Sequence, residues 1–227
     1  KEPVKNKPSK PAKKIAPIQE KLDNKLIIAV IDTGVKLDHP DIDIIWTNKK
    51  EIAGNGIDDD NNGFVDDVHG WDFMSEDNDP SDEYGHGTIV SGAIEGIAGN
   101  NVSIMPIRSG NHAFTLYDIM RGIIYAVDNG AKVINMSLGG PVESWLFDEV
   151  IQWAYRKGVV IVAAAGNSNS SQMMYPAGYR NVIGVGALDA SGKRADFRRW
   201  GPNYGFYVDV YALGVDVPST SIDGRHG

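Results

Sequence analysis

The sequence predicts an α/β protein with a doubly wound, mostly parallel sheet and helices on both faces. Short runs of apolar, strongly β-forming residues, such as 26–31 and 159–164, are typical of strands buried on both sides of a sheet. Segments with apolar residues at helical spacing separate several of these runs. Strands and helices that alternate along a chain form parallel sheets with helices packed above and below.

The predicted elements follow one another from residue 26 onwards. The predicted strands cover 26–31, 102–106, 132–137, 159–164, 182–187 and 207–213. The first predicted helix starts at His86, and its predicted apolar face consists of Ile89, Val90, Ala93, Ile94 and Ile97. A second helix starts at Thr115, where an acidic residue three positions on resembles a capping box. A third covers about 143–156, and its apolar residues, Trp145 included, are predicted to face the core.

The first 25 residues differ in composition from the rest and are predicted to form a flexible linker rich in lysine and proline. They hold eight lysines against three acidic residues and have little apolar content. Such a segment buries too little surface to offset the entropy lost on ordering. Binding of an anionic partner is the alternative interpretation of its positive charge. Residues 26–227 are predicted to form one domain, because the 42% apolar content of the chain suits a globular core.

Composition excludes several classes of function. Of the 22 basic and 30 acidic residues in the chain, residues 26–227 hold 14 and 27, which argues against a nucleic-acid-binding face. The chain has no cysteine, which excludes disulfides, zinc–thiolate sites and thiol catalysis. No apolar run reaches the roughly 18 residues that span a bilayer. We therefore expect no nucleic-acid partner and no membrane span.

The stretch 51–83 contains 12 acidic residues and no lysine or arginine, and part of it resembles a calcium loop. Oxygen-bearing side chains alternate before Gly63 as in the first half of an EF-hand loop, but no glutamate stands at the twelfth position, so Asp66 or Asp67 would have to close the site. Hard oxygen ligands favour Ca²⁺ over Zn²⁺. A solvated acidic loop is the alternative, but close carboxylates repel without a cation. The predicted ligands are Asp58, Asp60, Asn62, the carbonyl of Phe64, and Asp67.

Asp32 and His86 are the first candidates for catalysis. Asp32 ends a predicted buried strand, and the carboxyl ends of parallel strands are where α/β proteins place ligands and chemistry. His86 stands between two glycines at a loop-to-helix junction, where a rigid helix start would present its ring outward. A turn aspartate and an ordinary core or surface histidine are the alternatives for each residue taken alone.

Asn167 is the third candidate. It follows the predicted strand 159–164 and the small residues Ala165 and Gly166, which leave room for a docked group. A side-chain amide at such a position can donate a hydrogen bond to a developing oxyanion, whereas a turn asparagine is the alternative. Asp32 and Asn167 each follow a predicted buried strand. The three residues in the order Asp32, His86, Asn167 therefore indicate a catalytic site more specifically than any one of them alone.

These segments together resemble the subtilisin-like serine proteases, or subtilases. The matching motifs are 30–35 around Asp32, 85–88 around His86, 131–140 and 164–167, and they occur in the family's order over about nine tenths of the chain. The resemblance implies a subtilisin-like fold in which Asp32 orients His86 and His86 removes a proton from a serine. It also implies that Asn167 helps to hold the oxyanion.

The nucleophile that the resemblance implies is not found in the sequence. The family carries it in a Gly-Thr-Ser-Met-Ala-type motif, and no such string occurs before Gly227. Ser221 lacks the preceding glycine and the following small apolar helix, so nothing would fix its hydroxyl against His86. We expect a domain incomplete at its C-terminal end, inactive alone, with the serine beyond residue 227. The alternatives are a catalytically inactive pseudoprotease or peptide-binding module that ends there, and a two-chain enzyme.

The resemblance also indicates how a substrate would bind. In the family, the segment that contains Ser137 to Gly140 pairs with an extended peptide by strand addition. The predicted substrate-binding residues are Ser137, Leu138, Gly139, Ala164 and Gly166. By the same resemblance we expect a monomeric, calcium-stabilised endopeptidase that is secreted or held in the cell envelope, with a polypeptide substrate and an N-terminal propeptide as partners.

Overall fold

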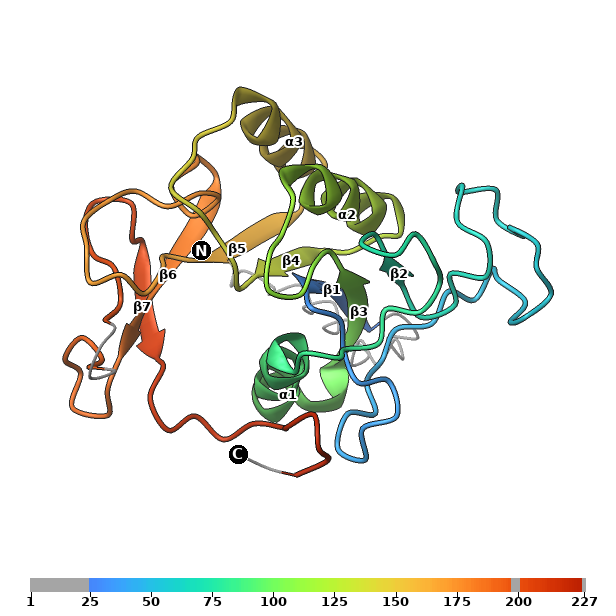
Figure 1. The fold of residues 1–227 in the computed structure, drawn as a ribbon, viewed down its shortest axis with the longest axis horizontal. Coiled ribbons are helices and arrows are strands. Elements are labelled where there is room, and N and C mark those ends of the chain that lie inside the picture. Colours follow the sequence, from blue (N-terminus) through green and yellow to red (C-terminus); the bar gives the residue numbers. More distant parts are fainter. Residues whose placement is uncertain (1–24, 197–200, 226–227) are drawn as a thin grey trace, which may run out of the picture.

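The computed structural model describes residues 25–196 and 201–225, which form a seven-stranded sheet with helices on both faces (Figure 1). The strand order is β2-β3-β1-β4-β5-β6-β7, and the named strands all pair in parallel. The strands are β1 (Leu26–Asp32), β2 (Trp71–Asp72), β3 (Val102–Arg108), β4 (Val133–Met136), β5 (Val160–Ala164), β6 (Val182–Leu188) and β7 (Val210–Leu213). The helices are α1 (His86–Ala98), the short 3-10 helix η1 (Gly99–Asn101), α2 (Leu116–Asp128) and α3 (Trp145–Arg156). The predicted doubly wound, mostly parallel α/β fold is confirmed.

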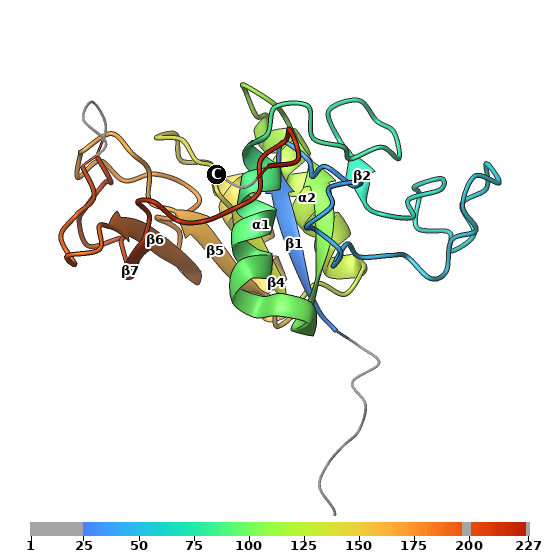
Figure 2. The same cartoon turned by 90° about the horizontal axis from the view of Figure 1, so that it is seen from below.

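The central strand β1 is buried between two layers of helices. Helices α2 and α3 cover one face of the sheet, and α1 covers part of the other (Figures 1 and 2). Successive side chains of β1 point to opposite faces, so Ala29 and Ile31 join the core beneath α2 and α3, whereas Val30 joins the smaller core beneath α1. Burial on both faces explains why this strand is an unbroken apolar run.

Most predicted elements are found with small shifts at their ends. The second predicted strand continues to Arg108 as β3, and the last one starts at Val210 as β7. Strand β2 was not predicted, because two residues are too few to show a period. The predicted linker lies outside the described residues apart from Lys25. In the described ranges, no helix has the length and apolar character needed to cross a membrane.

Helix α1 packs through its small residues and through Val90 and Ile94, so the predicted apolar face is confirmed only in part. Its buried positions are Gly87, Thr88, Ser91 and Gly92, whereas Ile89 and Ile97 are 47% and 88% exposed. Residues with little or no side chain let the helix backbone approach the sheet and its neighbouring loop closely. The prediction for the start of α3 was also wrong, because Trp145 is 77% exposed.

Strands β5, β6 and β7 present an apolar surface on the side of the sheet that α1 occupies. The opposite face of β5 and β6 joins the core beneath α3 through residues such as Ile161 and Val182, whereas all four residues of β7 are exposed. The alternate residues therefore point to the α1 side, and no described helix covers them there (Figure 2). We call this surface the open face: Val160, Val162, Ala164, Ile183, Val185, Ala187, Val210 and Ala212.

Candidate active site

Asp32 and His86 form a direct contact at the carboxyl end of β1. Nδ1 of His86 lies 2.7 Å from Oδ1 of Asp32. The Asp32 side chain is fully buried, and the amide of Thr33 donates to the same oxygen at 2.8 Å. The His86 side chain is 45% exposed, so its ring joins a buried carboxylate to the surface. Among described residues 25–196 and 201–225, no side chain hydrogen-bonds to Nε2 of His86.

The contact with Asp32 changes the proton affinity of His86. The hydrogen bond to Asp32 raises the pKa of His86, burial opposes this rise, and the negative charges of Asp32 and Asp82 add to it. A carboxylate on Nδ1 favours the tautomer that carries its proton there, which leaves Nε2 to accept a proton from another group. The pair can therefore act as an oriented general base.

Two glycines allow the strand and the helix to meet at this point. A Cβ at Gly87 would lie 2.0 Å from the Gly34 carbonyl oxygen and 3.2 Å from the Cβ of Asp32. Gly34 has φ +99°, and a Cβ there would lie 2.4 Å from the Pro80 oxygen. Such contacts are too short for any side chain, so both positions require glycine. In the motif around His86, packing therefore requires Gly87, just as the chemistry requires the histidine.

The start of α1 is capped from outside the helix by a residue that the sequence analysis missed. The N-cap residue Gly85 has φ +104° and no side chain to accept a hydrogen bond. Instead, Asp82 accepts from the amide of Thr88 at 2.9 Å, and Thr33 accepts from the amide of Gly87 at 2.9 Å. Free amides at a helix start need such acceptors, and an acidic one suits the helix dipole.

A cavity of about 260 Å³ brings together several residues predicted to bind substrate. Its lining includes Ser137, Ala164, Gly166 and Asn167, at the carboxyl ends of neighbouring parallel strands. Leu138 packs partly against the core instead, and Gly139 is exposed. Asn167 is exposed too, which leaves its amide accessible. The structure therefore gathers Ser137 with the Asn167 segment, and places Leu138 and Gly139 beside rather than in this cavity.

The loop that carries Asn167 is held by Asn203, which the sequence analysis also missed. Asn203 is fully buried, and its Nδ2 donates to the Ala165 carbonyl at 3.0 Å. Its Oδ1 accepts from the amides of Ser168 and Ser170 at 2.8 and 3.2 Å. A Cβ at Gly166 would lie 2.7 Å from Nδ2 of Asn203, so only glycine fits there. One side chain thus fixes the backbone on both sides of Asn167.

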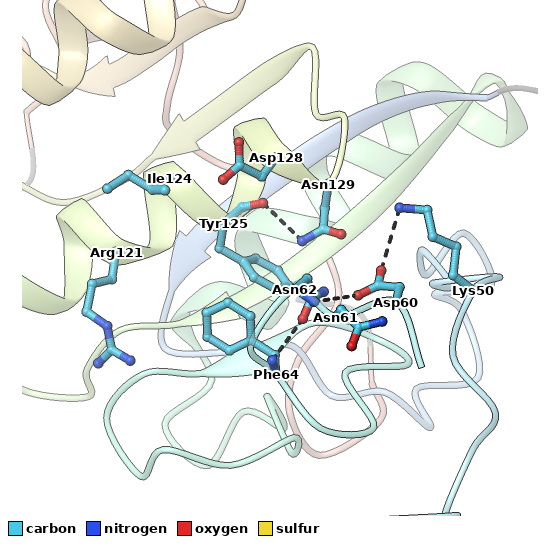
Figure 3. Close-up of a pocket in the computed structure, with 10 residues that line it drawn as sticks. All are labelled: Lys50, Asp60, Asn61, Asn62, Phe64, Arg121, Ile124, Tyr125, Asp128 and Asn129. Atoms are coloured by element: carbon cyan, nitrogen blue, oxygen red, sulfur yellow. Dashed lines mark hydrogen bonds and ion pairs between the residues drawn. The ribbon is translucent and has the colours of Figure 1, made fainter. Parts of the chain in front are cut away.

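The acidic loop gathers carboxylates from two separate segments. Glu51, Asp58 and Asp60 each have a carboxylate oxygen in this group, and the three oxygens lie within 4.8 Å of one another. Asp58 and Asp60 also accept from the amide of Asn62, at 3.0 and 3.1 Å, and Lys50 lies 3.6 Å from Asp60. A cavity of about 370 Å³ lies between this loop and α2. Asp60 and Asn62 are among the residues that line it (Figure 3). Glu51 was not among the predicted ligands, because its contribution depends on the fold.

Asp67 has a different environment from the rest of that loop. It is fully buried and accepts from the Tyr125 hydroxyl at 2.7 Å, from Asn62 at 2.9 Å and from Asn48 at 2.8 Å. Burial raises the pKa of its carboxyl group, whereas these hydrogen bonds lower it. The structure therefore does not bring Asp67 into the group of Glu51, Asp58 and Asp60. Phe64 packs its ring on Tyr125, edge to face at 5.0 Å.

Comparison with known proteins places the chain in a family. The model of the subtilase family matches residues 23–225. The thermophilic serine proteinase of Bacillus sp. strain AK1 is 43% identical over 210 residues, which cover 88% of this chain and 46% of the relative. Thermitase of Thermoactinomyces vulgaris is 35% identical over 85% of this chain and 64% of the relative. Subtilisin DY of Bacillus licheniformis is 36% identical over 85% of this chain and 66% of the relative. The chain thus spans about half to two thirds of these relatives, and it belongs to the subtilase family.

Proposed function

We propose that this chain forms the aspartate and histidine part of a serine endopeptidase site. The observation that carries this proposal is the 2.7 Å contact between His86 and the buried carboxylate of Asp32. It lies at the carboxyl end of β1, the strand at which the sheet order reverses and where α/β proteins bind their ligands. The serine is supplied by a segment outside the 227 residues of this sequence.

In this proposal each side chain has one role in peptide hydrolysis. Asp32 holds the proton on Nδ1 of His86, and Nε2 takes the proton of the serine hydroxyl as its oxygen attacks the peptide carbonyl. His86 then gives this proton to the departing amine, while Asp32 stabilises the imidazolium formed in between. Asn167 donates from its amide to the oxyanion, a contact worth about 10²- to 10³-fold in rate.

A polypeptide substrate is proposed to bind along the segment that contains Ser137 to Gly139. Ser137, Ala164 and Gly166 line one end of a cavity that continues over the open face past Val162 and Val185. We propose that one apolar side chain of the substrate occupies the end beside Ser137 and Gly166. Backbone pairing at such a segment gives affinity without a strict demand for sequence. We therefore propose an endopeptidase of broad sequence preference.

The open face supports the placement of the missing serine. Three strands there expose apolar residues on the same side of the sheet as α1, with Val160 and Val210 45% and 47% exposed. Apolar surface of this kind on adjacent strands calls for a covering element. We propose that an apolar helix from outside this sequence packs on the open face and presents the serine to Nε2 of His86.

The test uses the full-length gene product. It should cleave an unfolded protein substrate, and an organophosphorus or sulfonyl fluoride reagent should inactivate it by labelling one serine, which mass spectrometry of the peptides would place beyond residue 227. Labelling of Ser221 or no labelling would contradict the assignment. Binding of peptides without cleavage would support a peptide-binding module instead.

We further propose that the group of Glu51, Asp58 and Asp60 binds Ca²⁺. All its donors are oxygen atoms, and three carboxylates within 4.8 Å of one another repel. Lys50, 3.6 Å from Asp60, supplies one positive charge against three negative charges. Asn62 and Phe64 lie on the same loop, and we propose the side-chain oxygen of Asn62 and the Phe64 carbonyl as additional neutral ligands. A bound ion would hold residues 51–67 in one conformation and so stabilise the fold.

Calcium binding predicts a thermal shift. At a free Ca²⁺ concentration of about 100 times Kd, binding adds about 2.7 kcal/mol, which raises Tm by roughly 5–10 °C in a domain of this size. EDTA should reverse this rise, and Asp58→Asn should reduce it. Asp79→Asn is the matched control, because Asp79 lies in the same acidic stretch but outside the group. A Tm that ignores both Ca²⁺ and EDTA would contradict the proposal.

We propose that the protein works outside the cytoplasm. Extracellular Ca²⁺ sites bind the ion at about 10⁻⁴–10⁻³ M. We propose an affinity in this range for the group of Glu51, Asp58 and Asp60, which suits extracellular rather than cytosolic concentrations. Fractionation of the source cells, with the activity followed in medium, envelope and cytosol, tests this. Activity confined to the cytosol would contradict it.

A further inference from the structure

Asp82 lies where the two halves of the candidate site meet. It is 7% exposed, and both of its carboxylate oxygens accept hydrogen bonds, as in an ionised carboxylate. Oδ1 accepts from the Thr33 hydroxyl at 2.9 Å and from the amides of Tyr84 and Gly85 at 2.9 and 2.8 Å. Oδ2 accepts from the amide and the hydroxyl of Thr88 at 2.9 and 2.7 Å. Five donors from three segments thus converge on one buried side chain.

These bonds fasten the residues next to both members of the Asp32–His86 pair. Thr33 follows Asp32 directly, and its hydroxyl also accepts from the amide of Gly87, the residue after His86, at 2.9 Å. Gly85 precedes His86 and binds Asp82 through its amide. The ends of β1 and α1 are therefore held together by the same carboxylate, and neither Asp32 nor His86 can shift without breaking these bonds.

The charge on Asp82 also acts on the site. Among the described residues, no lysine or arginine forms an ion pair with it, whereas the neighbouring Glu83 pairs with Arg108 at 2.8 Å. The charged side chains that act on His86 are Asp32, through its hydrogen bond and charge, and Asp82, through its charge. Both favour the protonated ring, so Asp82 acts on the base at a distance as well as through the backbone.

We propose that Asp82 is a positioning residue of this site, which holds His86 against Asp32 by fastening the start of α1 to the turn after β1. The catalytic role of Asp82 rests on the proposed function. Its effect on the contact between His86 and Asp32 does not, and can be measured without any peptidase assay. The substitution Asp82→Asn has nearly the same shape, keeps one acceptor oxygen, and removes the charge together with at least one hydrogen bond.

The experiment is an NMR titration of the His86 ring in the full-length enzyme. In the parent protein, the Nδ1 proton shared with Asp32 should give a resolved downfield signal. In Asp82→Asn we expect this signal to broaden or disappear, and the acid dissociation constant of His86 to rise by roughly two- to tenfold. Glu83→Gln is the matched control: it removes one negative charge from the adjacent, exposed residue, and both readouts should stay as in the parent.

A second variant keeps the proposal testable if Asp82→Asn does not fold. Thr33→Val removes one of the five hydrogen bonds and leaves the charge, so it should disturb the downfield signal, while Thr33→Ser should restore it. In the full-length enzyme, Asp82→Asn should lower kcat by about 10- to 100-fold with little change in KM, as expected for a misplaced base. A folded Asp82→Asn variant with the parent's signal and His86 titration would overturn the proposal. An inactive parent enzyme would instead refute the proposed function alone.

Discussion

Gly92 in helix α1 offers a sharp test of the packing next to the candidate site. A Cβ at this buried position would lie 2.1 Å from Oγ1 of Thr220 and 2.8 Å from its Cβ and Cγ2. Thr220 cannot turn away freely, because its hydroxyl donates to the Thr88 carbonyl at 2.8 Å. Gly92→Ala therefore forces the segment around Thr220 away from α1.

The structure sets the size of this effect. Overpacking costs about 1–3 kcal/mol and loss of the Thr220 hydrogen bond about 1 kcal/mol, whereas alanine gains about 1 kcal/mol over glycine in a helix. The free energy of unfolding should thus fall by about 1–3 kcal/mol. Gly96→Ala is the matched control one turn further along the same helix: nothing lies within 4 Å of its Cβ, so it should gain up to about 1 kcal/mol.

Thermal and urea unfolding, followed by circular dichroism, compare the two variants. Their Tm values should differ by roughly 5–15 °C, because 1 kcal/mol shifts Tm by about 2–4 °C in a domain of this size. A Gly92→Ala variant that is as stable as Gly96→Ala would refute the tight contact between α1 and the Thr220 segment.

Two further predictions concern titrating groups. Tyr125→Phe removes the 2.7 Å hydrogen bond to the buried Asp67 carboxylate, so the free energy of unfolding in urea should fall by about 1.5–3 kcal/mol at neutral pH. This loss should become smaller as the pH falls through the pKa of Asp67, because the protonated carboxyl group is a weaker acceptor. An equal loss at all pH values would contradict the prediction. The pKa of His86 is raised in the folded state, so the contribution of this group to stability is complete below its unfolded pKa and disappears as the pH rises through the folded pKa. The loss of stability in His86→Gln should therefore be larger at about pH 6 than at about pH 9, and the opposite order would contradict the Asp32–His86 bond.

The sheet could be predicted because its signals are local. Buried parallel strands such as β1 are apolar on both faces and stand out as continuous runs. The N-cap Thr115 was recognisable by the acidic residue three positions on, and the structure shows the expected bond from the amide of Asp118 at 3.0 Å. Trp145 and Ile97 were placed wrongly because periodicity shows that a helix has an apolar side, but not which residues a neighbouring element covers.

The candidate site was only partly predictable, for a related reason. Asp32 and His86 stand in motifs where glycines and a strand end constrain the backbone, so their roles could be read locally. Asp82 and Asn203 act through hydrogen bonds to distant backbone, and a single aspartate or asparagine in a loop carries no pattern that reports such partners. Glu51 joins Asp58 only through folding, which a contiguous calcium motif does not show.

The most direct test of the central claim is the peptidase activity of His86→Ala in the full-length enzyme. If His86 is the general base oriented by Asp32, kcat/KM should fall by about 10⁴-fold or more, because the members of such a site act as a unit. His69→Gln is the control, since the His69 ring bonds to the Trp46 carbonyl at 3.0 Å instead of to a carboxylate. Loss of activity in His86→Ala alone is the predicted result. An activity within about tenfold of the parent would contradict the claim that this chain supplies the base of the protease.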